Sequence, residues 1–193
     1  MENEKAKFSS MEEGSGKDWD IIKKSVDKTF KTLPDRILRE MRALDDEPCS
    51  FPIGRLEHCL QTATRAYRDG RDKEYVICAL IHDIGDGLAS ANHADLGAVI
   101  LKPFVSEKNY WMVAHHGIFQ GYYFFHHLGL DRNIRDQYQD HPYYEYTKEF
   151  CHKYDQNAFD PEYKSMSLEE FEPMLREVFA MPKNSIYKKE EKK

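Results

Sequence analysis

Apolar side chains recur every three or four residues through most of this chain, and no stretch alternates convincingly between apolar and polar residues. This spacing places the apolar residues on one face of an α-helix, so it predicts helices and argues against strands. The expected helical stretches are residues 19–33, 37–44, 53–67, 76–82, 92–102, 106–116, 143–154 and 167–180. The predicted fold class is therefore all-α.

Individual residues mark where several of these helices begin or end. Pro34 ends the first stretch, and Ser106 is expected to cap the helix that follows it. Ser167 and Glu170 have the spacing of a capping box at the start of the last stretch. Pro173 lies inside that stretch, so its helix is expected to kink or to begin late.

Length and charge suggest how the chain is organised. A chain of 193 residues suits one domain with a sizeable core. Residues 1–17 are expected to form a flexible arm and residues 183–193 a flexible charged tail, which leaves a single domain over residues 18–182. The net charge of −6 disfavours broad contact with a nucleic-acid backbone.

Several classes of protein are disfavoured by what the sequence lacks. It has no apolar run near 18 residues and no apolar segment of the signal-peptide type, so no membrane partner is expected. The four cysteines include no C-x-x-C pair, which argues against a structural zinc knuckle and favours reduced thiols. The expected location is the cytoplasm.

The segment ALIHDIGD places a histidine and an aspartate, His82 and Asp83, at the end of an apolar run. A His-Asp dipeptide is expected roughly once by chance in a chain of this composition, so the pair alone is no evidence. Residues 76–82 are apolar on nearly all sides, however, which predicts a buried helix. A buried carboxylate is costly without a partner, and a metal ion removes that cost.

Two further residues could join this pair. His58 lies beside the apolar face of residues 53–67, where a lone histidine is more often a core residue than a metal ligand. Asp155 comes late in the helix that begins near residue 143. A negative charge is disfavoured there by the helix dipole, which weakens the interpretation of Asp155 as an ordinary C-terminal carboxylate.

The pattern of His58, His82-Asp83 and Asp155 resembles the HD-domain metalloenzyme superfamily over about residues 50–160. The segments LEHCLQTA and ALIHDIGD carry most of the resemblance, which implies one compact helical bundle with a metal site in its core. Most members are phosphohydrolases, and a smaller branch consists of mixed-valent diiron oxygenases. That branch includes myo-inositol oxygenase and enzymes that cleave hydroxylated aminoalkylphosphonates. The LEHxLQxA segment and its short step to the HD pair look most like the phosphonate-cleaving group.

The resemblance also implies a set of metal ligands and catalytic residues. His93 and His116 match two further histidines of the phosphonate-cleaving group, and the register of SEK at 106–108 favours His116 over His115. Asp83 and His116 are the expected catalytic residues. One ion would be held by His58, His82 and Asp155, and the other by His93 and His116, with Asp83 bridging the two. Two iron ions are expected, whereas manganese, zinc or nickel would suit a hydrolase.

Three hypotheses for the function follow. The first is a diiron oxygenase that uses O₂ to cleave a small hydroxylated substrate, with a 1-hydroxy-2-(trimethyl)aminoethylphosphonate as the expected type of compound. The alternative is a metal-dependent phosphohydrolase that acts on a nucleotide or phosphomonoester. A metal-binding module without turnover is the least favoured, because burying six ionisable groups is an expensive way to build a scaffold.

The substrate-binding residues are less clearly marked. Two places that are basic in the phosphonate-cleaving group hold Gln120 and His152 here. The aromatic run at residues 117–127 is interpreted either as core packing or as a pocket wall that holds a quaternary ammonium group by cation–π attraction. The candidate substrate-binding residues are Gln120, His115, His152, Tyr122, Tyr123 and Arg55.

Overall fold

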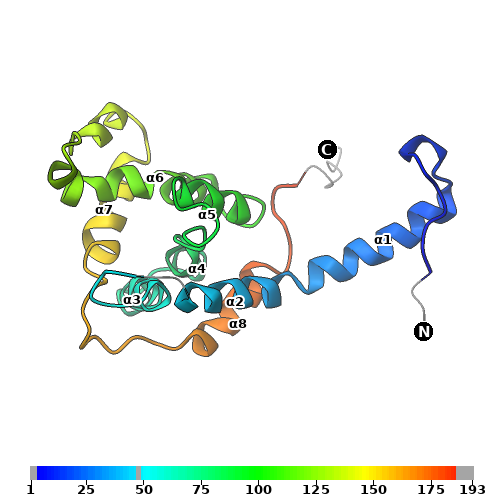
Figure 1. Cartoon of the computed structure of the whole chain (residues 1–193), viewed down its shortest axis with the longest axis horizontal. Helices are drawn as coiled ribbons and strands as arrows, with labels where there is room; N and C mark the ends of the chain where they lie inside the picture. The colour runs from blue at the N-terminus through cyan, green and yellow to red at the C-terminus, as the bar shows by residue number, and fades with distance from the viewer. Residues whose placement is uncertain (1–3, 47–48, 186–193) are drawn as a thin grey trace. The chain divides into compact units, whose positions relative to one another are not determined.

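A computed structural model of the chain describes residues 4–46 and 49–185. Every regular element within these residues is helical, which confirms the predicted all-α class (Figure 1). The chain divides into two units, residues 1–37 and 38–193, and helix α2 (Leu33–Ala43) crosses the division. None of the described helices is long and apolar enough to span a membrane.

The first unit contains η1 (Met11–Glu13) and helix α1 (Gly16–Lys31). Ser15 and Asp18 form a capping box that starts α1, two residues before the domain boundary expected at residue 18. The segment before the helix folds against it, because the ring of Phe8 stacks on Trp19 with centroids 5.8 Å apart. The flexible arm at residues 1–17 stays a prediction, and residues 1–3 lie outside the described part.

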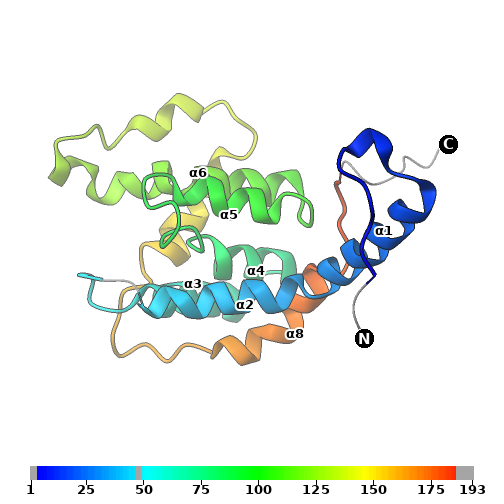
Figure 2. The ribbon, with the colours of Figure 1, turned by 45° about the vertical axis from the view of Figure 1, so that its right-hand side comes forward.

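The second unit contains all the candidate metal ligands. Its elements are η2 (Leu44–Asp46), α3 (Arg55–Arg68), α4 (Lys73–Ile81), α5 (His93–Leu101), α6 (Glu107–Phe124), η3 (Phe125–Leu128), η4 (Ile134–Tyr138), α7 (Tyr144–Phe150), the π-helical turn η5 (Cys151–Asp155) and α8 (Leu168–Val178). Helix α4 is buried along its length from Tyr75 onward and packs against α3, α6 and α8 (Figure 2). The predicted buried helix is thus confirmed at the centre of this unit.

Three helix boundaries differ clearly from the expectations. Helix α2 begins at Leu33, so Pro34 lies in its first turn and does not end the preceding helix, which ends at Lys31. Helix α6 continues to Phe124, eight residues past the expected end, so most of the aromatic run is helical. Helix α8 begins at Leu168 with the predicted capping box intact and continues through Pro173, so the late start is wrong. Phe171 and Leu175 are buried on this helix, and their packing stabilises it where proline removes one hydrogen-bond donor.

The C-terminal segment is anchored up to its last described residues. The backbone N–H groups of Lys183 and Asn184 donate to the carbonyl oxygen of Pro103 over 2.6 and 2.9 Å. The part of the expected flexible tail beyond residue 185 lies outside the described residues.

Glu74 connects three segments of the second unit. Its carboxylate accepts hydrogen bonds from the backbone of Ser106 over 2.6 Å and from the side chain of Asn109 over 2.8 Å, and it pairs with Lys183. Burial opposes the charge, but these donors outweigh it and lower the pKa of Glu74 from 4.5 to about 2. The charged form of Glu74 therefore stabilises the start of α6 and the C-terminal segment together.

Replacing Glu74 by Gln is expected to lower the free energy of unfolding by about 1–2 kcal/mol at neutral pH, because charge-assisted hydrogen bonds are lost. The pKa is depressed in the folded state. The contribution is therefore fully present above pH 4.5 and is lost as the pH falls toward about 2. Urea denaturation of both proteins at neutral and acidic pH measures the difference. A difference that does not shrink in acid would contradict this assignment.

Candidate metal centre

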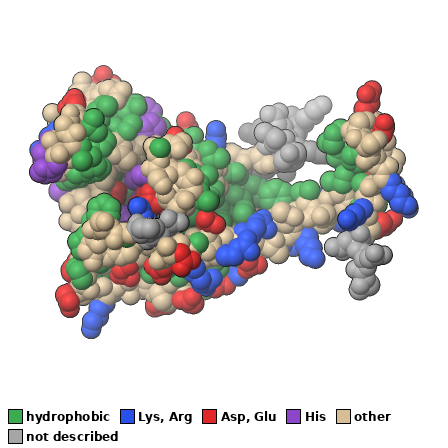
Figure 3. Space-filling view, in the orientation of Figure 1, with side chains coloured by type: hydrophobic (Ala, Val, Ile, Leu, Met, Phe, Trp, Pro, Cys, Tyr) green, Lys and Arg blue, Asp and Glu red, His purple; other side chains and the backbone are tan. Residues whose placement is uncertain are grey.

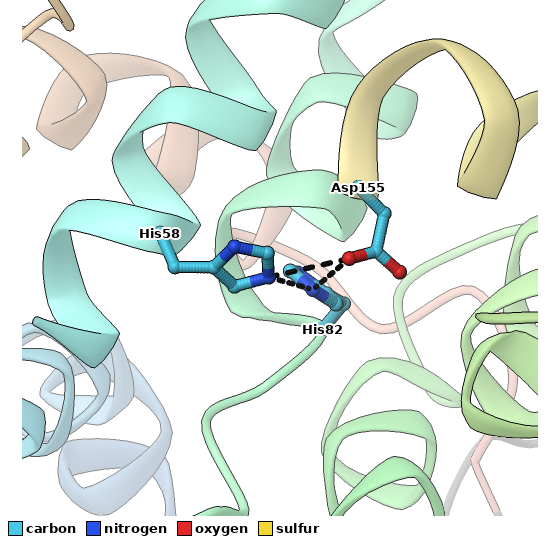
Figure 4. A group of neighbouring side chains, drawn as sticks. All are labelled: His58, His82 and Asp155. Carbon is cyan, nitrogen blue, oxygen red and sulfur yellow. Dashed lines mark hydrogen bonds and ion pairs between the residues drawn. The ribbon is translucent and has the colours of Figure 1, made fainter. Parts of the chain in front are cut away.

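Three side chains from distant parts of the sequence form the first cluster. His58 comes from α3, His82 follows the last residue of α4, and Asp155 ends η5 (Figure 4). The Nε2 atom of His58 lies 3.2 Å from Nε2 of His82 and 3.3 Å from Oδ1 of Asp155. All three side chains are buried. Their free nitrogen and oxygen atoms face one point, where a metal ion could be held.

A second cluster lies on the other side of Asp83. Its Oδ1 atom is 2.9 Å from Nε2 of His116 on α6 and 3.3 Å from Nε2 of His93, the first residue of α5. The two imidazole nitrogens are 3.2 Å apart. These three atoms could hold a second ion.

The carboxylate of Asp83 joins the two clusters. While Oδ1 faces His93 and His116, Oδ2 lies 3.4 Å from the Nε2 atoms of both His58 and His82. Each oxygen of one carboxylate thus faces a different group of imidazoles. A carboxylate placed in this way could contribute one oxygen to each of two metal sites.

The second ring nitrogen of each of these histidines meets an acceptor. The Nδ1–H groups lie 2.7–3.3 Å from the oxygens they face. With the proton on Nδ1, Nε2 keeps its lone pair for a metal, so the surrounding structure selects the ligating tautomer. The pairs are His58 with the carbonyl of Ala158, His82 with that of Ala79, His116 with that of Val113, and His93 with the carboxylate of Asp86.

The electrostatics of the site favour a bound cation. Burial disfavours an imidazolium, but the carboxylates of Asp155 and Asp83 outweigh it and raise the pKa of His58 to about 10. Burial is likewise outweighed at Asp83, where the neighbouring histidines hold the pKa well below its usual range. The two carboxylates therefore stay ionised in the core. The Oδ1 atom of Asp155 faces the two histidines and also accepts a hydrogen bond from Gln120, whereas its Oδ2 atom is buried without a hydrogen-bond partner.

Two glycines let the elements of the site approach closely. A Cβ atom on Gly97 of α5 would lie 2.7 Å from the carbonyl oxygen of His82. A Cβ atom on Gly85 would lie 2.5 Å from the carbonyl oxygen of His93. Backbone atoms cannot move aside at a low cost in free energy, so only glycine allows α5 to pack against the turn that carries Asp83. Neither position was predicted from the sequence, although the glycine in HDIGD marks one of them.

The structure brings His116, and not His115, to the clusters. The ring of His115 stacks on Trp111 with centroids 3.9 Å apart, and its Nδ1 atom lies 2.8 Å from the carbonyl oxygen of the same residue. The space-filling view also shows histidines at the surface of the part that carries α6 and α7 (Figure 3). His126 and His127 of η3 are exposed. By contrast, His58, His82 and His116 of the clusters are buried and His93 is half-buried.

A cavity of about 750 Å³ opens beside the two clusters. Arg55, Gln120 and Tyr123 line it, as do His58, Asp83, His93, His116 and Asp155. Gln120 donates a hydrogen bond over 2.9 Å to Oδ1 of Asp155, and its own Oε1 atom is buried without a partner. A large cavity next to convergent polar groups is the usual form of a small-molecule site.

Other candidate substrate-binding residues lie outside this lining. Tyr122 is covered by the guanidinium groups of Arg132 and Arg135, at 4.1 and 3.6 Å from its ring centroid. His152 is exposed, and its Nδ1 atom lies 3.2 Å from the hydroxyl of Tyr123. His115, as described above, is also absent from the cavity wall.

The aromatic run is divided between the core and the wall of the cavity. Phe119 is buried in the core, whereas Tyr123, Phe124 and Phe125 line the cavity. The sequence analysis did not single out Phe159, whose ring stacks on His58 with centroids 4.5 Å apart. No sequence motif marks this contact, because it depends on the path of the chain after η5.

Comparison with known proteins gives two similarities. The model of the HD domain family matches residues 55–159, more than half of the chain. A curated protein of Leisingera caerulea, 1-hydroxy-2-(trimethylamino)ethylphosphonate dioxygenase (glycine-betaine-forming), is 34% identical over 71 residues. The match covers 31% of this chain and 36% of that protein.

Proposed function

This chain belongs to the HD domain family, and on that premise we propose that it is a dinuclear non-haem iron oxygenase. The proposed reaction uses O₂ to cleave a small hydroxylated substrate oxidatively. The observation that carries the proposal is the position of Asp83, whose two carboxylate oxygens face two separate histidine clusters beside one cavity.

The donor atoms fit the proposed cofactor. Imidazole nitrogens and carboxylate oxygens suit iron, and they would also accept manganese, zinc or nickel. Two bound iron ions would supply the activation of O₂ and the polarisation of a substrate hydroxyl. The residues proposed to hold them are His58, His82 and Asp155 for one ion, His93 and His116 for the other, and Asp83 for both.

The protein's own contribution is to position the reactants. Because the Nδ1–H groups are fixed by acceptors, the imidazoles of the clusters have defined orientations. The cavity holds the substrate next to Asp83 and His116, the residues proposed to act at the reacting centre. Holding reactants in one geometry contributes much of the rate in enzymes of any class.

The proposed substrate type is a hydroxylated aminoalkylphosphonate with a trimethylated nitrogen. The name of the Leisingera caerulea relative supports it, although the match covers only about a third of that protein. The aromatic rings of Tyr123, Phe124 and Phe125 in the cavity wall also support it, because aromatic faces attract quaternary ammonium groups.

An oxygen electrode tests this proposal. Protein purified anaerobically with ferrous iron should contain about two ions per chain and should consume O₂ when offered a hydroxylated phosphonate or polyol. Release of phosphate from phosphomonoesters or nucleotides without O₂ would instead favour the phosphohydrolase alternative. One ion per chain, with His93→Ala and His116→Ala unchanged in metal content, would rule out the dinuclear site.

A further inference from the structure

The charged groups of the cavity wall, apart from the proposed metal ligands, include one cation. This is Arg55, at the first position of α3, and its guanidinium pairs with the carboxylate of Asp86. The second carboxylate in the wall belongs to Asp95 of α5. Outside the clusters the described lining therefore carries two negative charges and one positive charge.

The pair of Arg55 and Asp86 is held in place. The side chain of Asp86 is only 11% exposed, and its Oδ1 atom lies 3.3 Å from Nδ1 of His93. Arg55 is 26% exposed. An anion close to this guanidinium would also lie close to the carboxylate of Asp86. The repulsion from Asp86 would therefore largely cancel the attraction to Arg55.

Aromatic side chains form part of the remaining wall, which also contains the neutral polar side chains of Ser90, Asn92 and Gln156. Tyr123, Phe124, Phe125 and Phe51 present aromatic rings to the cavity. The negative face of an aromatic ring attracts cations and repels anions. The Oε1 atom of Gln120, which is buried without a partner, is an acceptor and cannot donate to an oxyanion.

We propose that Asp86 determines the charge specificity of the cavity by neutralising Arg55. Any anionic group of the substrate then binds at the metal ions themselves, and the rest of the substrate is uncharged or cationic. This inference rests on the proposed function for the position of the metal ions. Asp86 makes two contacts, each with its own effect. Its contact with His93 orients that imidazole, and its contact with Arg55 neutralises the one cation of the described lining.

Three phosphonates with the same anchor and different tails test the proposal. In 2-(trimethylammonio)ethylphosphonate, 3,3-dimethylbutylphosphonate and 2-sulfoethylphosphonate, one phosphonate group is available to the metal ions and the tetrahedral centre at the far end is positive, neutral or negative. Their dissociation constants for the metal-loaded protein are measured by calorimetry without O₂. The sulfonate is expected to bind at least about tenfold more weakly than the neutral compound, and the trimethylammonium compound at least as tightly. Equal or tighter binding of the sulfonate would overturn the proposal.

Variants of the charged residues then test whether Asp86 is responsible for the charge specificity of the cavity. Asp86→Asn keeps an oxygen that can face His93 but releases Arg55, so it should improve sulfonate binding by about tenfold. Asp95→Asn removes the same charge from the wall without freeing Arg55 and should change sulfonate binding much less. The double variant Arg55→Gln/Asp86→Asn removes both charges of the pair and should leave sulfonate binding close to that of the wild type. A marked loss of sulfonate binding in the double variant would show that Arg55 already serves as an anion clamp.

The outcomes separate this inference from the proposed function. If no hydroxylated compound causes O₂ consumption but the order of the three tails holds, the oxygenase is wrong and the charge specificity stands. If O₂ is consumed fastest with a substrate whose negative charge lies on the tail away from the hydroxyl, the oxygenase stands and the charge specificity is wrong.

Discussion

Replacing Asp83 by Ala is expected to lower the metal content from about two ions per chain to one or none and to reduce turnover at least about a hundredfold. One carboxylate contacts both histidine clusters, so its removal takes a ligand from each proposed ion at once. The loss should exceed that of any single histidine variant. Metal analysis of the purified protein, together with O₂ consumption under saturating substrate, measures both effects.

The control for this prediction is Asp95→Asn. Asp95 lines the same cavity but belongs to neither cluster, so the variant should keep its metal ions. Circular dichroism of both variants establishes that the helical fold is retained. Two ions per chain in folded Asp83→Ala would contradict the bridging role.

Replacing Gly97 by Ala is expected to destabilise the protein by about 2 kcal/mol and to reduce its metal content. The new Cβ atom would lie 2.7 Å from the carbonyl oxygen of His82 and 3.2 Å from that of Ile81, so α5 has to move away from the end of α4. Because α5 begins with His93 and α4 leads into His82, this movement separates the two clusters. Thermal denaturation and metal analysis measure the two consequences.

Gly16→Ala is the matched control. Gly16 is the first residue of α1, and a Cβ atom there meets nothing within 4 Å. The same substitution should therefore leave both the melting temperature and the metal content close to those of the wild type. If Gly97→Ala behaves like this control, the packing of α5 does not position the ligands as described.

Local features of the fold could be predicted from the sequence because they depend on neighbouring residues. The helical repeat established the all-α class, the apolar run before His82 predicted the buried α4, and Ser167 with Glu170 predicted the start of α8. The actual end of α6 and the continuation of α8 through Pro173 could not be predicted. Those boundaries depend on packing against other helices, which outweighs local preference.

The sequence by itself determined which side chains were candidates for a metal site, because the HD pair and the other histidines lie in short motifs that can be recognised by their spacing. Only the tertiary structure decided their arrangement, in which the two oxygens of Asp83 face different clusters. His116, which the sequence already favoured over His115, joins the clusters. It also decided that Tyr123 lines the cavity while its neighbour Tyr122 packs under arginines. Adjacent residues on a helix point about 100° apart, so only the position of the surrounding helices determines which of them meets the site.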